Sequence, residues 1–443
     1  MNKWWHISLL LSCYGFFKEY RPSEPFITPF LTGPGKNFTN EEVTQEIYAV
    51  GIYFNLSLLV LVFLLTDYLR YKPVLIAGGI SGIIVWTLLI VGKTIPVMQV
   101  VEFFYGFFMA SEVAYYTYIY AKVDKEHYQK VTSHTRTAFL LGKASAGLSS
   151  QLLVEFHVLD YLQLNYITVC ALAMTTLVSI LLPSVPQSIY FHRCESSANT
   201  SNSSGQIDEN NKFGLNRTAK KHSCKSKFKS AFTFLYEDLR EAYTNSYVLE
   251  WSLWWGLATC GYLQIATYSQ VLWEEINKAE EVKLKNGLVE FVYSILGAAA
   301  AFGIGYIKLP WQKWGEFTLG ILTLVQAACI FGAAYLTNLY FAYAVYIAFG
   351  ILYHSAITIA SSEVAKDIRE DSYALIFGIN TFFALILQTI LTAIVVNYLK
   401  CVIRTQFQIY GCYLFVTGGV YLVISFYTLF KYRPKRSLDL HTN

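Results

Sequence analysis

The sequence predicts an all-α membrane protein with twelve transmembrane helices, and three observations support this fold class. Hydrophobic residues make up 54% of the 443 residues and charged residues only 14%, a balance that a soluble chain of this length does not need. Apolar stretches of about 20 residues, the length that crosses a bilayer, recur along the chain. One long polar segment, 183–245, divides these stretches into two sets of six.

The first half, residues 1–182, begins with an apolar run at 4–17 that leads into two prolines, Pro22 and Pro25. Each proline removes a backbone donor, so we expect the first helix to break beside Glu24, inside the membrane. Alternatively, the prolines end a short helix and Glu24 reaches the lipid headgroups. Five more spans are expected at 46–66, 74–91, 98–123, 135–154 and 164–182.

The second half, residues 246–431, has the same organisation. Its six expected spans lie at 247–273, 288–307, 317–336, 340–363, 374–398 and 407–430, and a tail follows at 432–443. Segment 183–245 has no apolar period and is expected to be a cytoplasmic linker. Six spans, a basic loop and six spans are typical of the major facilitator architecture, in which two six-helix bundles are related by a pseudo-two-fold axis.

Basic residues orient the chain in the membrane. They concentrate in the loops after even-numbered spans, in the linker and in the tail. The positive-inside rule makes that side cytoplasmic and places both termini there. An opposite loop holds the sequence Asn37-Phe38-Thr39, so Asn37 is a predicted glycosylation site on the outer side.

Motifs for catalysis and metal binding are missing from the sequence. It contains no GxSxG, P-loop, CxxC or HExxH pattern, so we expect neither an enzyme nor a cofactor or metal site. The eight cysteines imply no disulfide framework, and the net charge of +4 gives no reason to expect nucleic acid as a partner. The expected partners are the lipid bilayer, a small-molecule substrate and, where transport is coupled, a counter-ion or proton.

The predicted span at 98–123 carries an acid, Glu112, near its middle. Insertion scales put an acid at a helix centre at about 2.5–3.5 kcal/mol, so such groups face a partner or an aqueous cavity. Tyr115 and Tyr116 share the face of Glu112 on a regular helix. A buried carboxylate beside aromatic rings can hold a flat cation; the alternative is a salt bridge to a neighbouring helix.

Lys143 is a candidate for that salt bridge. Glu112 and Lys143 both lie about 15 Å from the inner surface by helix rise, on adjacent spans. A permanent pair would neutralise the acid, whereas a substrate that competes for the acid would make Lys143 part of an ion-pair switch.

Three charged residues follow the second span, namely Asp67, Arg70 and Lys72. A carboxylate near a helix end that pairs with basic residues can act as a gate, because such a pair breaks and re-forms during a conformational cycle. Alternatively, the two basic residues only follow the orientation rule.

Several stretches carry a family resemblance: RPSEPFITPFLTGP at Arg21, SEVAYYTYIY at Ser111, WSLWWGLATCGY at Trp251, NGLVEF at Asn286 and LIFGINTFFALILQTILT at Leu375. The chain resembles the reduced folate carrier and thiamine transporter family of vitamin carriers. The resemblance implies a plasma-membrane facilitator that imports a water-soluble vitamin by alternating access. The resemblance places Glu112, Tyr115 and Gln388 in the substrate site. Together with the residue patterns, we expect a site formed by Glu24, Glu112, Tyr115, Tyr116, Thr267 and Gln388.

The choice of substrate depends on three positions in this resemblance. Folate carriers are similar but have basic residues where this chain has Glu112, Gly350 and Gln388, and a dianionic substrate needs such charges. Thiamine transporters resemble the chain at Glu112, Tyr115 and Gln388, and an acid beside an aromatic ring suits a thiazolium cation. These residues favour thiamine over folate.

Two departures leave other readings open. Gly51 stands where the family has tryptophan, and Thr267 stands where thiamine transporters have asparagine. The alternatives are a diverged member that carries another organic ion through Lys143, and a non-transporting receptor or scaffold that acts through segment 183–245. Exchange for an organic anion, proton coupling and passive facilitation all fit the sequence.

Overall fold

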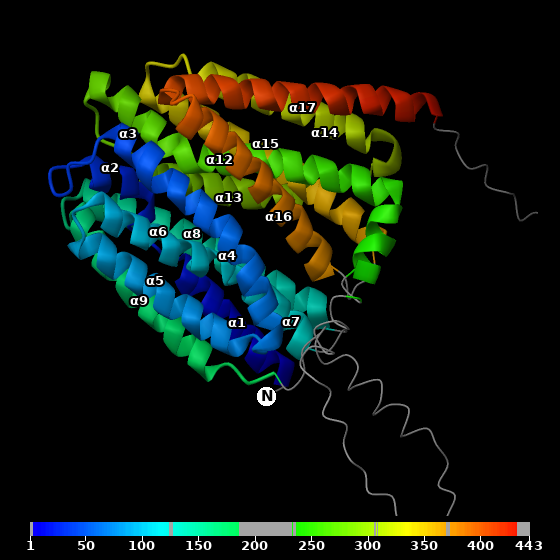
Figure 1. The fold of residues 1–443 in the computed structure, drawn as a ribbon, viewed down its shortest axis with the longest axis horizontal. Coiled ribbons are helices and arrows are strands. Elements are labelled where there is room, and N and C mark those ends of the chain that lie inside the picture. Colours follow the sequence, from blue (N-terminus) through cyan, green and yellow to red (C-terminus); the bar gives the residue numbers. More distant parts are fainter. Residues whose placement is uncertain are drawn as a thin grey trace, which may run out of the picture.

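The structure is a computed structural model that describes residues 3–123, 127–185, 233, 236–304, 307, 309–368 and 373–431. In this part of the chain every regular element is helical, and the helices form two groups (Figure 1). Most of the predicted linker and all of the predicted tail lie outside the described residues.

The first bundle contains α1 (Lys3–Glu19), η1 (Glu24–Phe26), α2 (Ile27–Thr32), α3 (Asn40–Glu42), η2 (Val43–Tyr48), α4 (Ala49–Tyr68), α5 (Lys72–Val91), α6 (Ile95–Ala110), α7 (Glu112–Lys122), α8 (Tyr128–Glu155) and α9 (Tyr161–Leu181). The predicted break in the first helix is confirmed, because α1 ends at Glu19 and the chain resumes as η1 with Pro25 in its first turn. The helices α6 and α7 meet at Ser111, which keeps right-handed helical angles, so 95–119 still forms one apolar span.

The second bundle contains α12 (Ser246–Glu280), α13 (Asn286–Ile304), α14 (Trp311–Ala333), α15 (Leu339–Lys366), α16 (Tyr373–Thr392), η5 (Ala393–Tyr398) and α17 (Ile403–Lys431). The side chain of Asn245 caps the start of α12 by accepting a hydrogen bond from the Tyr247 amide. On the outer side of each bundle two helices pack along their lengths, α5 on α9 and α14 on α17.

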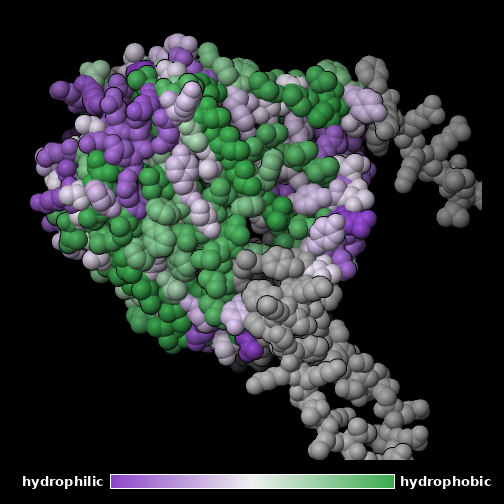
Figure 2. Space-filling view, viewed as in Figure 1, coloured by the Kyte–Doolittle hydropathy of each residue, from purple (hydrophilic) through white to green (hydrophobic). Residues whose placement is uncertain are grey.

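The surface fits a protein that crosses a membrane several times. Nine helical segments in the described residues are long and apolar enough to span it, and the other three predicted spans correspond to α1, α8 and α12. Figure 2 shows hydrophobic side chains over the middle of the visible face and hydrophilic ones toward its left and right ends. Large apolar side chains such as Leu61, Ile80 and Val423 are exposed, as lipid contact requires.

Three hydrophobic clusters show how the bundles meet. One cluster is shared by both bundles and joins residues such as Ile47 and Met98 to Ile265 and Val395. It lies toward the end of the molecule where α8 stops and α13 begins. At the opposite end, which carries the loop 69–71, each bundle has its own core, with Tyr71 in the first bundle's cluster. The two bundles are therefore joined at one end and packed separately at the other.

Backbone contact between α8 and α13 produces part of this joined end. A Cβ atom on Gly147 would lie 2.7 Å from the Gly287 carbonyl oxygen, and one on Gly287 would lie 2.6 Å from the Gly147 oxygen. Real Cβ atoms do not approach a carbonyl oxygen so closely. Only glycine at both positions lets the two helices touch here.

We predict that Gly147→Ala forces α8 and α13 apart and lowers the free energy of unfolding by about 1–3 kcal/mol, the usual cost of over-packing. The matched control is Gly378→Ala on α16, where a Cβ meets nothing within 4 Å. Because alanine favours helix, the control should be neutral or stabilising by about 0.5–1 kcal/mol. Thermal unfolding of the purified proteins in detergent measures both, and equal melting temperatures would contradict the packing described here.

Candidate functional site

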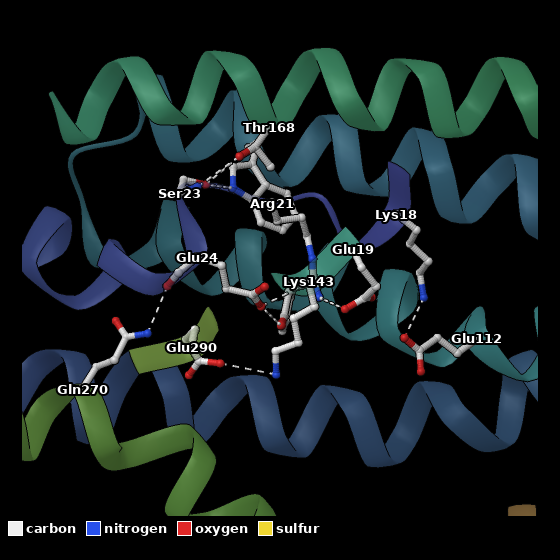
Figure 3. A network of polar contacts seen from close by, with 12 residues as sticks. Lys18, Glu19, Arg21, Ser23, Glu24, Glu112, Lys143, Thr168, Gln270 and Glu290 are labelled. Carbon is white, nitrogen blue, oxygen red and sulfur yellow. Dashed lines mark hydrogen bonds and ion pairs between the residues drawn. The ribbon is translucent and has the colours of Figure 1, made fainter. Parts of the chain in front are cut away.

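Seven charged side chains form ion pairs inside the first bundle and across to the second: Lys18, Glu19, Arg21, Glu24, Glu112, Lys143 and Glu290. Figure 3 shows Lys18 directed at Glu112, Arg21 between Glu19 and Glu24, and Lys143 directed at Glu290. They come from α1, the segment after it, η1, α7, α8 and α13. Three are basic and four are acidic, so the group carries a net charge of −1 when all seven are ionised. In the apolar interior of a membrane protein such a group marks a functional site by default.

Arg21 occupies the break between α1 and η1. Its guanidinium lies 3.1 Å from a carboxylate oxygen of Glu19 and 3.1 Å from one of Glu24. Arg21 and Glu19 are almost completely buried, whereas the side chain of Glu24 is 36% exposed. One arginine therefore pairs with an inner acid and an accessible one.

The polar backbone of this break is satisfied from neighbouring helices. The indole nitrogen of Trp86 donates to the Ser23 hydroxyl at 2.7 Å, and this hydroxyl shares a 2.9 Å hydrogen bond with Thr168. From the second bundle, the Gln270 amide donates to the Glu24 carbonyl oxygen at 3.0 Å. These bonds fix the segment that the prolines free from the helix.

Glu112 pairs with a lysine, though not with the expected one. The ammonium of Lys18 donates to Glu112 at 2.9 Å and lies 4.8 Å above the ring of Phe108. Lys18 is 1% exposed and Glu112 is 24% exposed. The expected Glu112–Lys143 pair is thus corrected, because Lys18 on α1 lies beside the junction of α6 and α7.

Lys143 instead crosses to the second bundle. Its ammonium lies 3.5 Å from a carboxylate oxygen of Glu290 on α13, and the Tyr346 hydroxyl donates to the other oxygen at 3.2 Å. The Lys143 side chain is 33% exposed. This ion pair joins the two bundles about halfway along α8.

Glu24 has a further partner in the first bundle. The Tyr105 hydroxyl donates to its carboxylate at 3.1 Å. The side chain of Glu24 is 36% exposed, compared with 24% for Glu112 and 15% for Glu290. Of these three carboxylates, that of Glu24 is the most open to a ligand.

Tyr115 and Tyr116, which the sequence analysis places in the substrate site, pack against the first helix in this conformation. Tyr115 is 1% exposed, donates to the Leu11 carbonyl at 3.1 Å and stacks on Tyr14. Tyr116 lies beside it with a ring-centroid distance of 5.2 Å and is partly buried. Both belong to the packing between α1 and α7, so a role in binding substrate stays a prediction.

Two predicted residues of the second bundle also make packing contacts. Gln388 is buried, and its backbone carbonyl accepts a hydrogen bond from Gln264. The Thr267 hydroxyl donates to the Leu263 carbonyl of its own helix. Thr267 precedes Gln270 by three residues, so the two lie on one face of α12.

The predicted gate and the glycosylation site stay predictions. Lys72 donates to the Ile180 carbonyl at 2.7 Å, which ties the start of α5 to the end of α9. Arg70 adopts a left-handed backbone angle, φ 62°, while the side chain of Asp67 lies outside the described part of the chain. Asn37 is exposed in the loop between α2 and α3, toward the joined end.

Comparison with known proteins identifies the family. The model of the reduced folate carrier matches residues 2–409. The chain belongs to the reduced folate carrier family.

Relatives of two kinds occur in the reduced folate carrier family. The chain is 39% identical over 462 residues to thiamine transporter 2 of Macaca fascicularis, covering 99% of this chain and 93% of that protein. It is 35% identical over 443 residues to folate transporter 1 of Caenorhabditis elegans, covering 99% and 95%. A solved structure of a POT family transporter in complex with a peptide conjugate shares the fold, with a TM-score of 0.65, 12% identity and 96% coverage of each chain.

The network contains residues that the sequence analysis did not assign for this member of the reduced folate carrier family. Lys18, Glu19 and Arg21 follow the first apolar run directly, where charges usually mark the end of a span. The charges of these three residues alternate in sign just before the segment that the prolines break. This alternation is the sequence feature that indicates an ion-pair network. Glu290 lies one turn after the start of α13. An acid so close to a helix end can be solvated at the membrane surface, so the sequence alone does not require an ion-pair partner for it.

A second group of ion pairs lies at the joined end. Glu155, the last residue of α8, pairs with Lys285 and, at 4.0 Å, with Lys283, both in the connection from α12 to α13. The Gln151 amide donates to the Leu284 carbonyl at 3.3 Å. The hydrogen bond from Lys285 holds the pKa of Glu155 below its ordinary value, so this contact between the bundles is ionised at neutral pH.

We predict that Glu112→Gln destabilises the protein by about 3 kcal/mol, because it leaves the buried ammonium of Lys18 without its counter-charge. The double variant Lys18→Met/Glu112→Gln removes both charges and should cost less than Glu112→Gln alone. Thermal unfolding in detergent measures the losses for Glu112→Gln, for the single variant Lys18→Met and for the double variant. A double variant whose loss equals the sum of the two single losses would contradict the pairing.

Proposed function

We propose that this protein is a plasma-membrane secondary transporter that imports a water-soluble vitamin by alternating access, with thiamine favoured over folate. Membership of the reduced folate carrier family and the names of its thiamine- and folate-transporting relatives support a vitamin carrier. The observation that carries the preference for thiamine is the partly exposed carboxylate of Glu24 beside Tyr105, in a network where four acidic side chains face three basic ones.

Thiamine carries one permanent positive charge on its thiazolium ring, which complements a network in which acidic side chains outnumber basic ones. A dianionic folate would add two negative charges in a region of low dielectric, where like charges repel strongly. We assign the carboxylate of Glu24 as the main contact of the cation, because it is accessible and lies beside the aromatic ring of Tyr105.

The arrangement of the bundles supports alternating access. They are joined at the end that carries Asn37 and have separate cores at the end that carries Arg70 and Lys72. With basic loops on the cytoplasmic side, the site opens inward and both termini are cytoplasmic. Cross-bundle pairs such as Glu155 with Lys285 would break in the outward-open state and re-form in this one.

Folate is the second candidate, and Lys143 is the observation that favours it. Its side chain is 33% exposed, and its ammonium could bind a carboxylate of an anionic vitamin if it left Glu290. The relative in Caenorhabditis elegans is named a folate transporter. The two substrates differ in the sign of their charge, so one set of variants separates them.

Uptake of labelled vitamins into cells that express the protein tests the proposal. We expect saturable thiamine uptake above that of control cells, and little uptake of reduced folate. Glu24→Gln should raise the KM for thiamine about tenfold, since a charge-assisted contact in a partly exposed site contributes about 1.5 kcal/mol.

The matched control is Glu275→Gln, which removes an exposed acid that pairs with Lys278 on the surface of α12; its KM should not change. Thiamine uptake no faster than in control cells, together with saturable folate uptake that Lys143→Met abolishes, would show that the charge argument is wrong. Repeating the uptake across pH values and with preloaded anions identifies a coupling ion.

A further inference from the structure

Tyr293 on α13 occupies a notch that only glycine can provide. A Cβ atom on Gly350 of α15 would lie 1.8 Å from Cε2 of Tyr293. The ring is therefore in direct contact with the backbone of α15, and no other residue at position 350 fits beside it. Tyr293 is 1% exposed.

Hydrogen bonds and stacking fix the orientation of this ring. The Tyr293 hydroxyl donates to the Tyr262 hydroxyl at 3.2 Å and lies 3.0 Å from Nε2 of His354. Its ring stacks on Tyr346 with a centroid distance of 5.1 Å. A ring held on several sides cannot turn its face away from its neighbours.

The face of the ring is directed at Lys143. The ammonium lies 5.3 Å from the centroid of Tyr293 and 3.5 Å from Glu290, which precedes Tyr293 by three residues on the same face of α13. A carboxylate and an aromatic face together form a seat for a cation. In this conformation a side chain from the other bundle occupies that seat.

Glu24 and Glu19 also attract the Lys143 ammonium, more weakly than Glu290 does. Figure 3 shows the lysine between Glu24 and Glu290, with its ammonium directed at Glu290. The two carboxylates compete for one ammonium, and Glu24 is the acid that the proposed function assigns to the substrate. The contact with the ring of Tyr293 adds to the attraction of Glu290, whereas Glu24 is already paired with Arg21.

We propose that Tyr293 is a positioning residue that sets charge specificity: its ring holds Lys143 against Glu290 and so keeps a second basic side chain off Glu24, which contacts Arg21 and Tyr105 and then binds the cationic group of the substrate. This inference rests on the proposed function. Without the ring, Lys143 pairs with Glu24 and acts as an internal competitor for an organic cation. The site then binds cations more weakly although no residue that contacts the substrate has changed.

A double-mutant cycle in thiamine uptake tests the inference. Tyr293→Leu removes the aromatic face and should raise the KM about three- to tenfold, the range of a partly desolvated cation–π contact, with a smaller change in maximal rate. In the Lys143→Met background the same substitution should change the KM about twofold or less, because no competing ammonium remains. Tyr293→Phe keeps the face and loses only the hydroxyl, so its KM should stay within about twofold of the unmodified protein.

Equal effects of Tyr293→Leu in both backgrounds, or an effect of Tyr293→Phe as large as that of Tyr293→Leu, would overturn the inference in favour of a structural role. A second measurement does not depend on the substrate. An experimental map of Tyr293→Leu should show the Lys143 ammonium at Glu24, whereas an ammonium that stays on Glu290 would overturn the inference. If the unmodified protein imports folate and not thiamine, the proposed function fails, and the map still decides the role of Tyr293.

Discussion

Charges inside a membrane protein must be neutralised close to where they lie, and this constraint organises the structure. Removing an ion from water costs several kcal/mol unless a partner and hydrogen bonds replace the solvent. Lys18 with Glu112 and Arg21 with Glu19 and Glu24 meet this requirement within the first bundle. Lys143 meets it by reaching Glu290 in the second bundle. The position of one bundle relative to the other is therefore tied to the charge of the site.

The two kinds of pair have different consequences for movement. Pairs within the first bundle can persist through a rigid-body rotation, because both partners move together. Pairs between bundles, such as Lys143–Glu290 and Glu155–Lys285, hold only while the joined end is closed. A bound cation can compete for the acids that are paired within the first bundle without moving the bundles apart. The same cation weakens the pairs between the bundles and so changes the stability of the closed end. Binding and conformation are then linked through electrostatics.

Much of the fold could be predicted because its determinants are local. Span length and proline positions depend on the sequence of one segment, and the break beside Glu24 lies where Pro22 and Pro25 predict it. The bounds of the linker and the tail stay predictions, because most of the linker and all of the tail lie outside the described residues. The family followed from long matching stretches distributed over the chain.

The partners within the site could not be predicted in the same way. Helix rise gives the depth of Glu112 and Lys143 but not the direction in which each side chain points. Glu112 points toward α1, so its carboxylate pairs with Lys18 and not with Lys143. A regular helix placed Tyr115 beside Glu112, yet the packing of α7 on α1 buries its ring against Tyr14. Such choices depend on how neighbouring helices are rotated, which no single segment encodes.

The most direct test of the charge argument is an experimental map of the protein with thiamine bound. We predict that the thiazolium ring lies between the bundles, within about 6 Å of the Glu24 carboxylate and of an aromatic ring. A ligand bound outside the space between the bundles, or oriented with its thiazolium toward Lys143 and Arg21, would contradict it.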